Sequence, residues 1–515
     1  MKKFLSKSLL VSGFLLLSKI LGFLRDMLLA ISFGSSGAMQ AFLVAFRLPE
    51  FVRKVTSSGV ITQILNPHIS DKLTNDQKEF IATVLYFIAI VLLVAVILMM
   101  IFSGFVVDAY AFGFSDDKGV QELIRTMFVI MIPYVLFNFV VGLISAVLNS
   151  HSKYVVSSVL PIILNLVMIA GIACSSYFNV AIYSVAWSVL IAGLLQFIVA
   201  LFALYSLAIK LPFSKSVIFI KNSQARSFLK KVPMTFFGSA VLQINGLVET
   251  FFASFLVSGS LAWLYYADRV NQFLYGIFGT AIATVMIPYL VKCKMDIKAF
   301  YLNLAWILKV ALLITIPSIV GLCVLSKPIV ITLFYYGEFN VLDIDATQLA
   351  LLGYLLALFC FVIIRVIVSG LYVQNKSTKV FYIGLICLVA TVIADTYVVN
   401  MFEYDRYAFF YLASVSSLIA LVNLLSQMLV MVDFKLGKFV EVYLPFKFLL
   451  KVAVGCICMF IVLKLFNLSD SYWISMSFFG RVENIMIVIL SGVVSFGTVL
   501  WLLGIKTTLK VDAQI

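Results

Sequence analysis

The sequence predicts an all-α polytopic membrane protein, and three observations support this fold class. Hydrophobic residues make up 63% of the chain and charged residues only 12%, with a mean hydropathy of +1.14, whereas soluble domains carry about 25% charged residues. Apolar runs of roughly 20 residues, the length that crosses a bilayer, recur from one end of the chain to the other. The positive charges outside these runs fall mainly in alternate connections. Little of the chain is left for a soluble domain.

The apolar runs predict about fourteen transmembrane spans. In order, they are expected at 8–32, 37–63, 80–106, 122–149, 155–175, 180–207, 229–256, 260–290, 302–323, 346–373, 379–400, 407–431, 446–466 and 484–505. The first run follows a basic start, as in a signal peptide, but no small-residue cleavage site precedes the charged segment that begins at Lys19. We therefore interpret it as the first membrane helix.

Lysine and arginine in short connections set the orientation of a membrane chain. One set of alternate connections, together with both ends of the chain, carries most of these residues. The opposite set contains only Lys118, Lys327, Arg406, Lys464 and Arg481. Both termini are therefore predicted to be cytoplasmic. The net charge of +14 is interpreted as this bias and as contact with anionic membrane lipids, and not as nucleic-acid binding.

The longest basic connection separates six predicted spans from eight. One constant shift aligns Arg47 with Arg269 and Ser36 with Ser258, at the second span of each half. Such a repeat is typical of two parallel bundles related by an axis along the membrane normal. We therefore predict an N-terminal six-helix lobe at 1–209, a basic cytoplasmic linker at 210–231, a C-terminal six-helix lobe at 232–431 and two additional helices at 432–515.

Ionisable side chains inside apolar spans cost at least about 2.5 kcal/mol each on insertion scales, so they usually face a wet cavity, a partner or a substrate. They are densest between residues 18 and 54. If the two halves face each other, these cations and those of the eighth span reach one central cavity. Arginine there would bind phosphate through paired hydrogen bonds. The predicted substrate-binding residues are Lys19, Arg25, Arg53 and Arg269, with Arg47 and Arg365 as secondary candidates.

The alternative for each cation is structural: the side chain snorkels to the interface or forms an ion pair with an acid in a span. The acids concerned, which are also candidates for gating or coupling, are Asp26, Glu50, Glu249 and Asp268. An acid stands next to an arginine in both halves, at Asp26 and at Asp268. Because adjacent helical residues point about 100° apart, we expect each of these acids to contact a neighbouring helix and not its own arginine.

The sequence contains few of the residues that catalytic or metal sites require. Its two histidines, His68 and His151, lie in short polar connections, and its seven cysteines show no CxxC spacing. The connections are too short and too poor in histidine and carboxylate for a membrane glycosyltransferase or phosphatase. We predict no enzyme, no catalytic residue, no metal site and no cofactor. Coupling of transport to the membrane potential, to Na⁺ or to H⁺ is left open.

Three segments are similar to one family. They are LGFLRD from Leu21, AFLVAFRLPEFVRKV from Ala41 and LAWLYYADRV from Leu261. Together they resemble the MurJ (MviN) family of bacterial lipid II flippases, within the wider MOP exporter superfamily, and the similarity runs from the first span to the fourteenth. The family implies a V-shaped pair of six-helix lobes, a central cavity for the pyrophosphate and sugar head of lipid II, and a groove for the polyprenyl tail in the last two helices.

The resemblance implies a head-group site at Arg25, Arg53 and Arg269, with Lys19 at a position where arginine is usual. Two positions depart from the family pattern: Gln40 stands where an acid is common, and Glu50 replaces a frequent asparagine. A gate that relies on the acid near Gln40 is in doubt here, and Glu50 adds a negative charge close to the phosphate site.

The function that the resemblance implies is transport of lipid II from the cytoplasmic to the periplasmic leaflet by alternating access, for peptidoglycan synthesis. We expect a monomer in the bacterial cytoplasmic (inner) membrane, with cell-wall synthesis proteins as partners. Three alternatives stay open: a flippase for another polyprenyl-linked saccharide, a cation-coupled drug exporter of the same superfamily, and a structural partner in a cell-division assembly. A drug exporter predicts a cavity rich in acids and aromatic residues, which the excess of cations disfavours.

Overall fold

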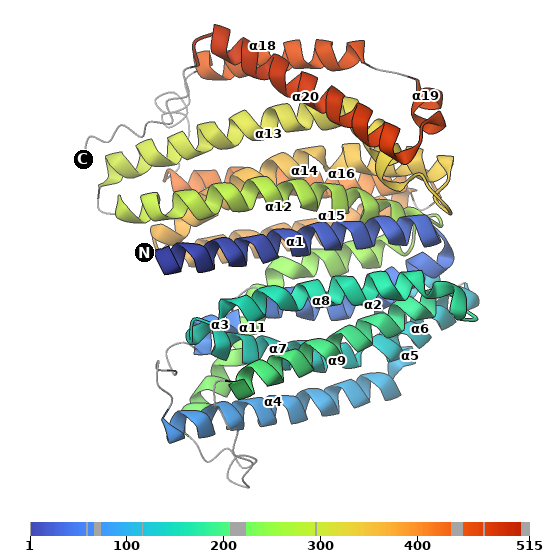
Figure 1. Cartoon of the computed structure of the whole chain (residues 1–515), viewed down its shortest axis with the longest axis vertical. Coiled ribbons are helices and arrows are strands. Elements are labelled where there is room, and N and C mark those ends of the chain that lie inside the picture. The colour runs from blue at the N-terminus through green and yellow to red at the C-terminus, as the bar shows by residue number, and fades with distance from the viewer. Residues whose placement is uncertain are drawn as a thin grey trace. The chain divides into compact units, whose positions relative to one another are not determined.

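The computed structural model describes residues 2–57, 60–65, 69, 74–115, 117–206, 223–293, 296–402, 404–433, 446–466 and 469–505. Within these ranges the chain is helical, with no strand (Figure 1). The predicted all-α class is therefore confirmed. The chain divides into two compact units, 1–262 and 263–515, and each is described by itself.

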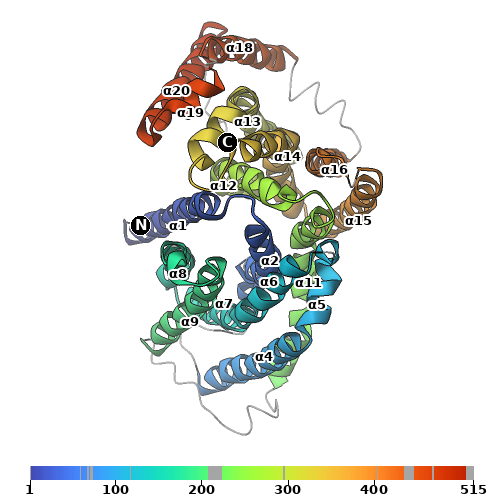
Figure 2. The ribbon, with the colours of Figure 1, turned by 90° about the vertical axis from the view of Figure 1, so that its right-hand side faces the viewer.

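The first unit is built from helices of very different lengths. They are α1 (Lys2–Phe33), α2 (Gly37–Ser57), α3 (Val60–Leu65), α4 (Asn75–Ile101), α5 (Ser103–Tyr110), η2 (Phe112–Phe114), α6 (Lys118–Met131), α7 (Pro133–Ser150), α8 (Tyr154–Ala173), η3 (Ser175–Tyr177), α9 (Ile182–Ser206) and α11 (Ser223–Ala253). α1 lies along α8, which in turn packs against α9 (Figures 1 and 2). α2 contacts α6, α7 and α11, and of its charged residues Glu50 is buried.

The second unit consists of longer helices. They are α12 (Ser260–Lys292), whose first turn belongs to the first unit, α13 (Ile297–Phe334), α14 (Val341–Val373), α15 (Ser377–Phe402), α16 (Ala408–Met431), α18 (Phe446–Leu465), α19 (Asp470–Ser475) and α20 (Phe478–Leu502). α14 packs against α13 and α16, while α18 and α20 pair with each other and cover α13 (Figures 1 and 2). We call α18 to α20 the C-terminal hairpin.

Ten helices of the described residues are long and apolar enough to cross a membrane. Large apolar side chains stand exposed on them, such as Leu98 at 48% and Phe202 at 72%, as expected where lipid replaces water as the solvent. The chain is therefore a multi-pass membrane protein. The four other predicted spans, 8–32, 37–63, 229–256 and 260–290, are also helical over their described residues, except that α11 ends at Ala253, but the count of fourteen is not confirmed.

Two predicted spans contain a break in the helix. The span expected at 80–106 ends as α4 at Ile101, and Phe102 (φ −95°, ψ 25°) separates it from α5. The span expected at 122–149 divides into α6 and α7 at Ile132, because Pro133 has no N–H to continue the hydrogen-bond ladder. Ile132 itself keeps helical angles (φ −60°, ψ −31°), so α6 and α7 together form one candidate span, Lys118–Ser150.

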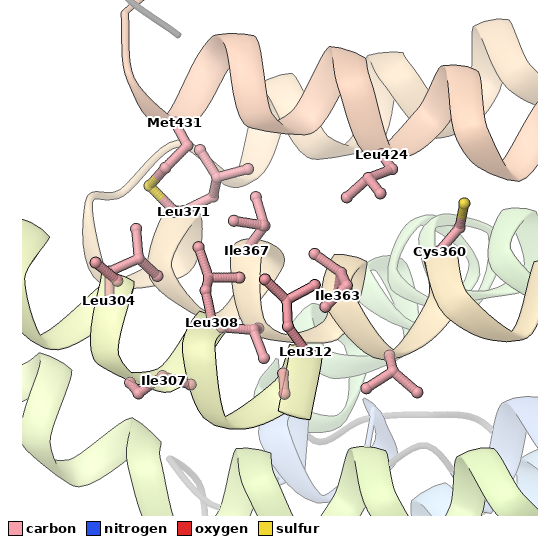
Figure 3. Packing of buried hydrophobic residues seen from close by; sticks show 14 of the residues in the cluster. Leu304, Ile307, Leu308, Leu312, Cys360, Ile363, Ile367, Leu371, Leu424 and Met431 are labelled. Atoms are coloured by element: carbon pink, nitrogen blue, oxygen red, sulfur yellow. The ribbon is translucent and has the colours of Figure 1, made fainter. Parts of the chain in front are cut away.

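The core of the second unit lies between α13, α14 and α16. Leu304 and Leu308 of α13 interdigitate with Ile363 and Ile367 of α14, and Met431 closes the cluster from α16 (Figure 3). Small residues let these helices approach closely, as is common in membranes. At Gly353 an added Cβ would lie 2.8 Å from the Cβ of Ala413, and the Gly353 carbonyl accepts a hydrogen bond of 2.5 Å from Ser417.

The unit boundary does not coincide with the predicted lobes. It falls within α12, and α11 is grouped with the first unit because it contacts α2, α3 and α4. Most of the predicted linker, 210–231, lies outside the described residues, as does the start of the predicted C-terminal pair of helices, at 434–445. The predicted domain boundaries therefore stay a prediction.

Arg481 fastens one end of the C-terminal hairpin to α13. The sequence analysis placed this residue in a connection, but it lies in the first turn of α20 with its side chain buried. The guanidinium donates to the carbonyl of Trp473 (2.8 Å) and to that of Tyr335 (3.0 Å), and it stacks over the ring of Tyr336 at 4.9 Å. Nearby, Lys327 of α13 pairs with Asp470 of α19 at 2.5 Å.

Replacing Arg481 with methionine is expected to loosen this hairpin. The carbonyls that it joins would lose their donor, so we expect the free energy of unfolding to fall by about 3 kcal/mol. Thermal unfolding of the purified chain measures the effect. Lys464→Met, an exposed cation in the last turn of α18, is the matched control and should leave the unfolding midpoint unchanged. Equal midpoints for the two variants would contradict the anchoring role.

Candidate functional site

A buried carboxylate gathers three cations on one face of α2. Arg47, Arg53 and Lys54 stand three or four residues from Glu50, the spacing that brings side chains together on a helix. Each has a nitrogen 3.6 Å from a Glu50 carboxylate oxygen. The Glu50 side chain is only 5% exposed, so its charge is desolvated and holds the cations strongly. The cluster carries more positive than negative charge.

Arg53 and Lys54 form the accessible edge of this cluster. Their side chains are 26% and 31% exposed, against 16% for Arg47. The Nε of Arg53 is buried and has no hydrogen-bond acceptor among the described residues. Buried donors are normally satisfied, so an open guanidinium edge beside a cationic cluster is a place where an anionic ligand would supply the missing acceptor.

Arg47 is held differently, because it joins α2 to α11. Its Nε donates to the Gly246 carbonyl at 2.8 Å. A Cβ added at Gly246 would lie 2.7 Å from the Arg47 Nη2, so a larger residue there would require the guanidinium to shift. Glu249, one turn further along α11, is half-buried. The contact of Arg47 in this structure therefore joins two helices. Its role as a secondary candidate for substrate binding stays a prediction.

Arg25 lies buried between α1 and α8. Its Nε and Nη2 donate to the same Asp26 oxygen, at 2.9 and 2.6 Å, and its Nη1 donates to Asn165 Oδ1 of α8 at 3.2 Å. Asn165 is fixed in turn by donating to the Ser18 carbonyl at 2.9 Å. The expectation that Asp26 avoids its own arginine is therefore wrong. Adjacent positions on a helix point roughly 100° apart, but the Arg25 side chain is long enough to reach the carboxylate of its neighbour.

Lys19 occupies the same helical stripe as Asp26, two turns earlier on α1, and is half-buried. Gln40 is buried and neutral. Its Nε2 donates to Ser258 Oγ at 3.2 Å, which ties the start of α2 to the turn after α11. A neutral amide thus occupies this position and holds two segments of the first unit together.

In the second unit, Arg269 and Asp268 are linked through a third residue. The Arg269 guanidinium stacks over the Tyr265 ring at 4.5 Å and donates to Gln272 Oε1 at 3.3 Å. The amide nitrogen of Gln272 donates to Asp268. The stacked ring and the amide fix the plane of the guanidinium, which suits paired hydrogen bonds to a phosphate.

Arg365 of α14 lies against the same helix, α12. It donates to the hydroxyl of Tyr275 at 3.1 Å, and its Cζ lies 5.5 Å from the centre of that ring. Tyr275 stands one helical turn beyond Gln272 and so shares its stripe. In the second unit, two arginines are therefore oriented by tyrosines that both belong to α12.

Sequence reasoning missed Asn165, Gln272 and Gly246. Asn165 and Gln272 are amides in apolar helices, a signal that could have marked them as partners of a charge. Gly246 acts through its carbonyl, and no sequence pattern identifies such a contact. Each unit thus holds oriented cations with polar partners, and the arrangement can bind a phosphate group without changing a covalent bond.

The sequence profile of the family described as "Lipid II flippase MurJ" matches residues 29–483. The chain belongs to the MurJ family. Among its relatives, "Probable lipid II flippase MurJ" of Buchnera aphidicola subsp. Schizaphis graminum is 32% identical and the match covers 97% of each chain. "Lipid II flippase MurJ" of Burkholderia cenocepacia is 30% identical over 75% of this chain and 77% of that protein.

Solved structures agree with this family. "Lipid II flippase MurJ, inward closed conformation" superposes with a TM-score of 0.81 at 26% identity, over 96% of this chain and 99% of that one. A multidrug resistance MATE family transporter of the MOP superfamily, in an inward-facing conformation, matches with a TM-score of 0.62 at 14% identity, over 81% of this chain and 95% of that one. The MATE likeness shows the fold alone. The MurJ family consists of transporters, and the chain is accordingly no enzyme.

Proposed function

We propose that this chain moves lipid II, the undecaprenyl-pyrophosphate-linked peptidoglycan precursor, from the cytoplasmic to the periplasmic leaflet of a bacterial cytoplasmic membrane. The observation that carries the substrate assignment is the match of the family profile over residues 29–483, together with relatives named for lipid II. The cation clusters support it, because a pyrophosphate is the charged part of that substrate and arginine suits it.

The head group is bound, in this proposal, by Lys19, Arg25, Arg53 and Arg269. Arg53 and Arg269 are oriented by Glu50 and by Tyr265, so each is ordered before substrate arrives. Glu50 serves as the counter-ion of Arg53 in the absence of substrate. When lipid II binds, its pyrophosphate becomes the negative charge nearest to Arg53.

Transport proceeds by alternating access, in which the binding site is exposed first to one side of the membrane and then to the other. Release of Asp26, Glu50, Glu249 or Asp268 from its present contacts accompanies the change, and coupling to membrane potential, Na⁺ or H⁺ supplies the direction. One charge moved across 100 mV contributes about 2.3 kcal/mol. The protein acts as a monomer among anionic lipids and alongside cell-wall synthesis proteins.

Complementation tests the proposed function. Expression of the chain in a bacterium depleted of its own lipid II flippase should restore growth and the exposure of lipid II in the periplasmic leaflet, with protein levels checked in the membrane. Absence of exposed lipid II, despite normal levels of the chain, would overturn the substrate assignment. Rescue of a different polyprenyl-linked saccharide alone would favour the alternative flippase.

The orientation makes a prediction at Cys174. This thiol is exposed at the end of α8, the end that a cytoplasmic N-terminus places in the periplasm. A chain that retains only Cys174 should react with a membrane-impermeant maleimide in cells with permeabilised outer membranes. His151→Cys in a cysteine-free chain marks the opposite end of α8 and should react only after lysis. The reverse pattern would place both termini in the periplasm.

A further inference from the structure

A groove of about 790 Å³ lies in the first unit between α5 and α6. Figure 2 shows these two helices beside each other, next to the break that separates α4 from α5. Four charged side chains and several apolar ones line it. None of them belongs to the cation clusters of α1, α2 or α12, so the groove is separate from the proposed head-group site.

The polarity of the groove changes along α6. Lys118, at the start of this helix, and Glu122 line one end, Arg125 follows, and Val129 and Ile130 line the other end. At 1.5 Å per residue, Arg125 lies about 10 Å and Ile130 about 18 Å along the helix from Lys118. Because Lys118 begins a candidate span, the charged end lies at the membrane surface and the apolar end lies in the hydrocarbon.

Arg125 is oriented within this groove. Its Nε donates to Ser103 Oγ of α5 at 3.3 Å, and a Cβ added at Gly104 would lie 3.4 Å from its Cζ. The guanidinium therefore lies against α5. Neither Nη1 nor Nη2 has an acceptor in the part of the chain that the structure describes. Arg125 is exposed, so these two donors are accessible to two oxygens of a phosphate.

The charges of the groove balance. Lys118 and Arg125 face Asp108 and Glu122, and Asp108 is held by a 2.7 Å hydrogen bond from the Gln121 side chain. An anionic head group would meet two carboxylates, and a purely cationic ligand would meet two cations. A zwitterion that carries a phosphate and an ammonium satisfies both signs at once.

The surface beside the groove is strongly apolar. At the break between α4 and α5, Ile101 is 64% exposed, Phe102 58% and Phe105 78%. Exposed side chains of this size next to the apolar end of the groove provide contacts for acyl chains. The site therefore offers charge at the interface and hydrocarbon contact below it, in the order in which a phospholipid presents them.

We propose that this groove binds a zwitterionic phospholipid with a primary ammonium, of the phosphatidylethanolamine type. Its phosphate accepts hydrogen bonds from Arg125, its ammonium donates to Glu122 and Asp108, and its acyl chains lie along Val129 and Ile130. The bound lipid fills the groove between α5 and α6 and so stabilises the packing of these two helices. This site is independent of the lipid II assignment.

The test uses the full chain in delipidated nanodiscs and phosphatidylethanolamine that carries a photoreactive group on an acyl chain. Crosslinks are expected in the peptide that contains 118–130. Arg125→Gln and Glu122→Gln should each weaken binding about tenfold, since each removes a charge-assisted contact. Lys153→Gln, an exposed cation at the start of α8, is the matched control and should bind as the wild type does. Unfolding midpoints verify the fold of every variant.

The identity of the head group is tested by competition. Phosphatidylethanolamine should displace the probe about tenfold more effectively than phosphatidylcholine, whose quaternary ammonium cannot donate hydrogen bonds, or than anionic phosphatidylglycerol. Stronger competition by either of these lipids would overturn the proposal, as would unchanged binding by both groove variants. Displacement by lipid II as effective as that by phosphatidylethanolamine would assign the groove to the substrate and would also overturn it.

Discussion

Replacing Arg53 with alanine is expected to lower the rate of lipid II transport at least about 30-fold. The side chain is the open edge of the Glu50 cluster, and its Nε lacks an acceptor among the described residues. Loss of a charge-assisted contact to a desolvated phosphate costs about 2 kcal/mol or more, which corresponds to this factor. Flipping of fluorescent lipid II in proteoliposomes measures the rate.

The controls separate charge, geometry and fold. Arg53→Lys keeps the positive charge but loses the planar fork, so its rate should lie between those of the wild type and of Arg53→Ala. Arg406→Ala removes an exposed arginine that stacks over Tyr407, and it should transport normally. A rate for Arg53→Ala equal to that of Arg406→Ala would show that Arg53 does not bind the substrate.

Replacing Asp26 with alanine is expected to destabilise the protein by about 3 to 5 kcal/mol. Arg25 is buried at 6% exposure, and loss of the carboxylate that accepts two of its hydrogen bonds leaves its charge poorly compensated. Thermal unfolding of the purified chain should show a markedly lower midpoint. An unchanged midpoint would mean that Asn165 and the other neighbours suffice to hold the guanidinium.

A double variant separates stability from transport at this pair. Arg25→Met with Asp26→Leu replaces both charges by apolar side chains, which often restores the stability that a single replacement removes. We expect its midpoint to approach that of the wild type while lipid II transport stays lost. Normal transport by a stable double variant would assign Arg25 a structural role alone.

The helices could be predicted because long apolar runs leave few alternatives in a membrane. Their interruptions were harder to place: Pro133 is a proline inside a span, whereas the break at Phe102 is marked only by the Ser103-Gly104 pair that follows it. Arg481 was assigned to a connection because it precedes the apolar run expected as the last span, 484–505. Its burial depends on carbonyls of α13 and α19, which no local pattern reveals.

The charged residues of the candidate site could be selected from the sequence, but their partners could not. The spacing of Arg47, Arg53 and Lys54 around Glu50 is a helical pattern and predicts their ion pairs. Arg25 instead meets a residue 140 positions away, Asn165. Contacts of that kind depend on how α1 and α8 pack, and side-chain flexibility lets Arg25 reach its own neighbour as well.

Transport by the purified chain tests the central claim most directly. The protein is reconstituted into liposomes with fluorescent lipid II, and in parallel with an undecaprenyl pyrophosphate that carries a different saccharide. The access of each lipid to an impermeant reagent is then followed over time. We expect lipid II to cross rapidly, in a manner that requires Arg53, while the other lipid crosses no faster than in protein-free liposomes. Equal transport of both lipids, or none of lipid II, would contradict the account.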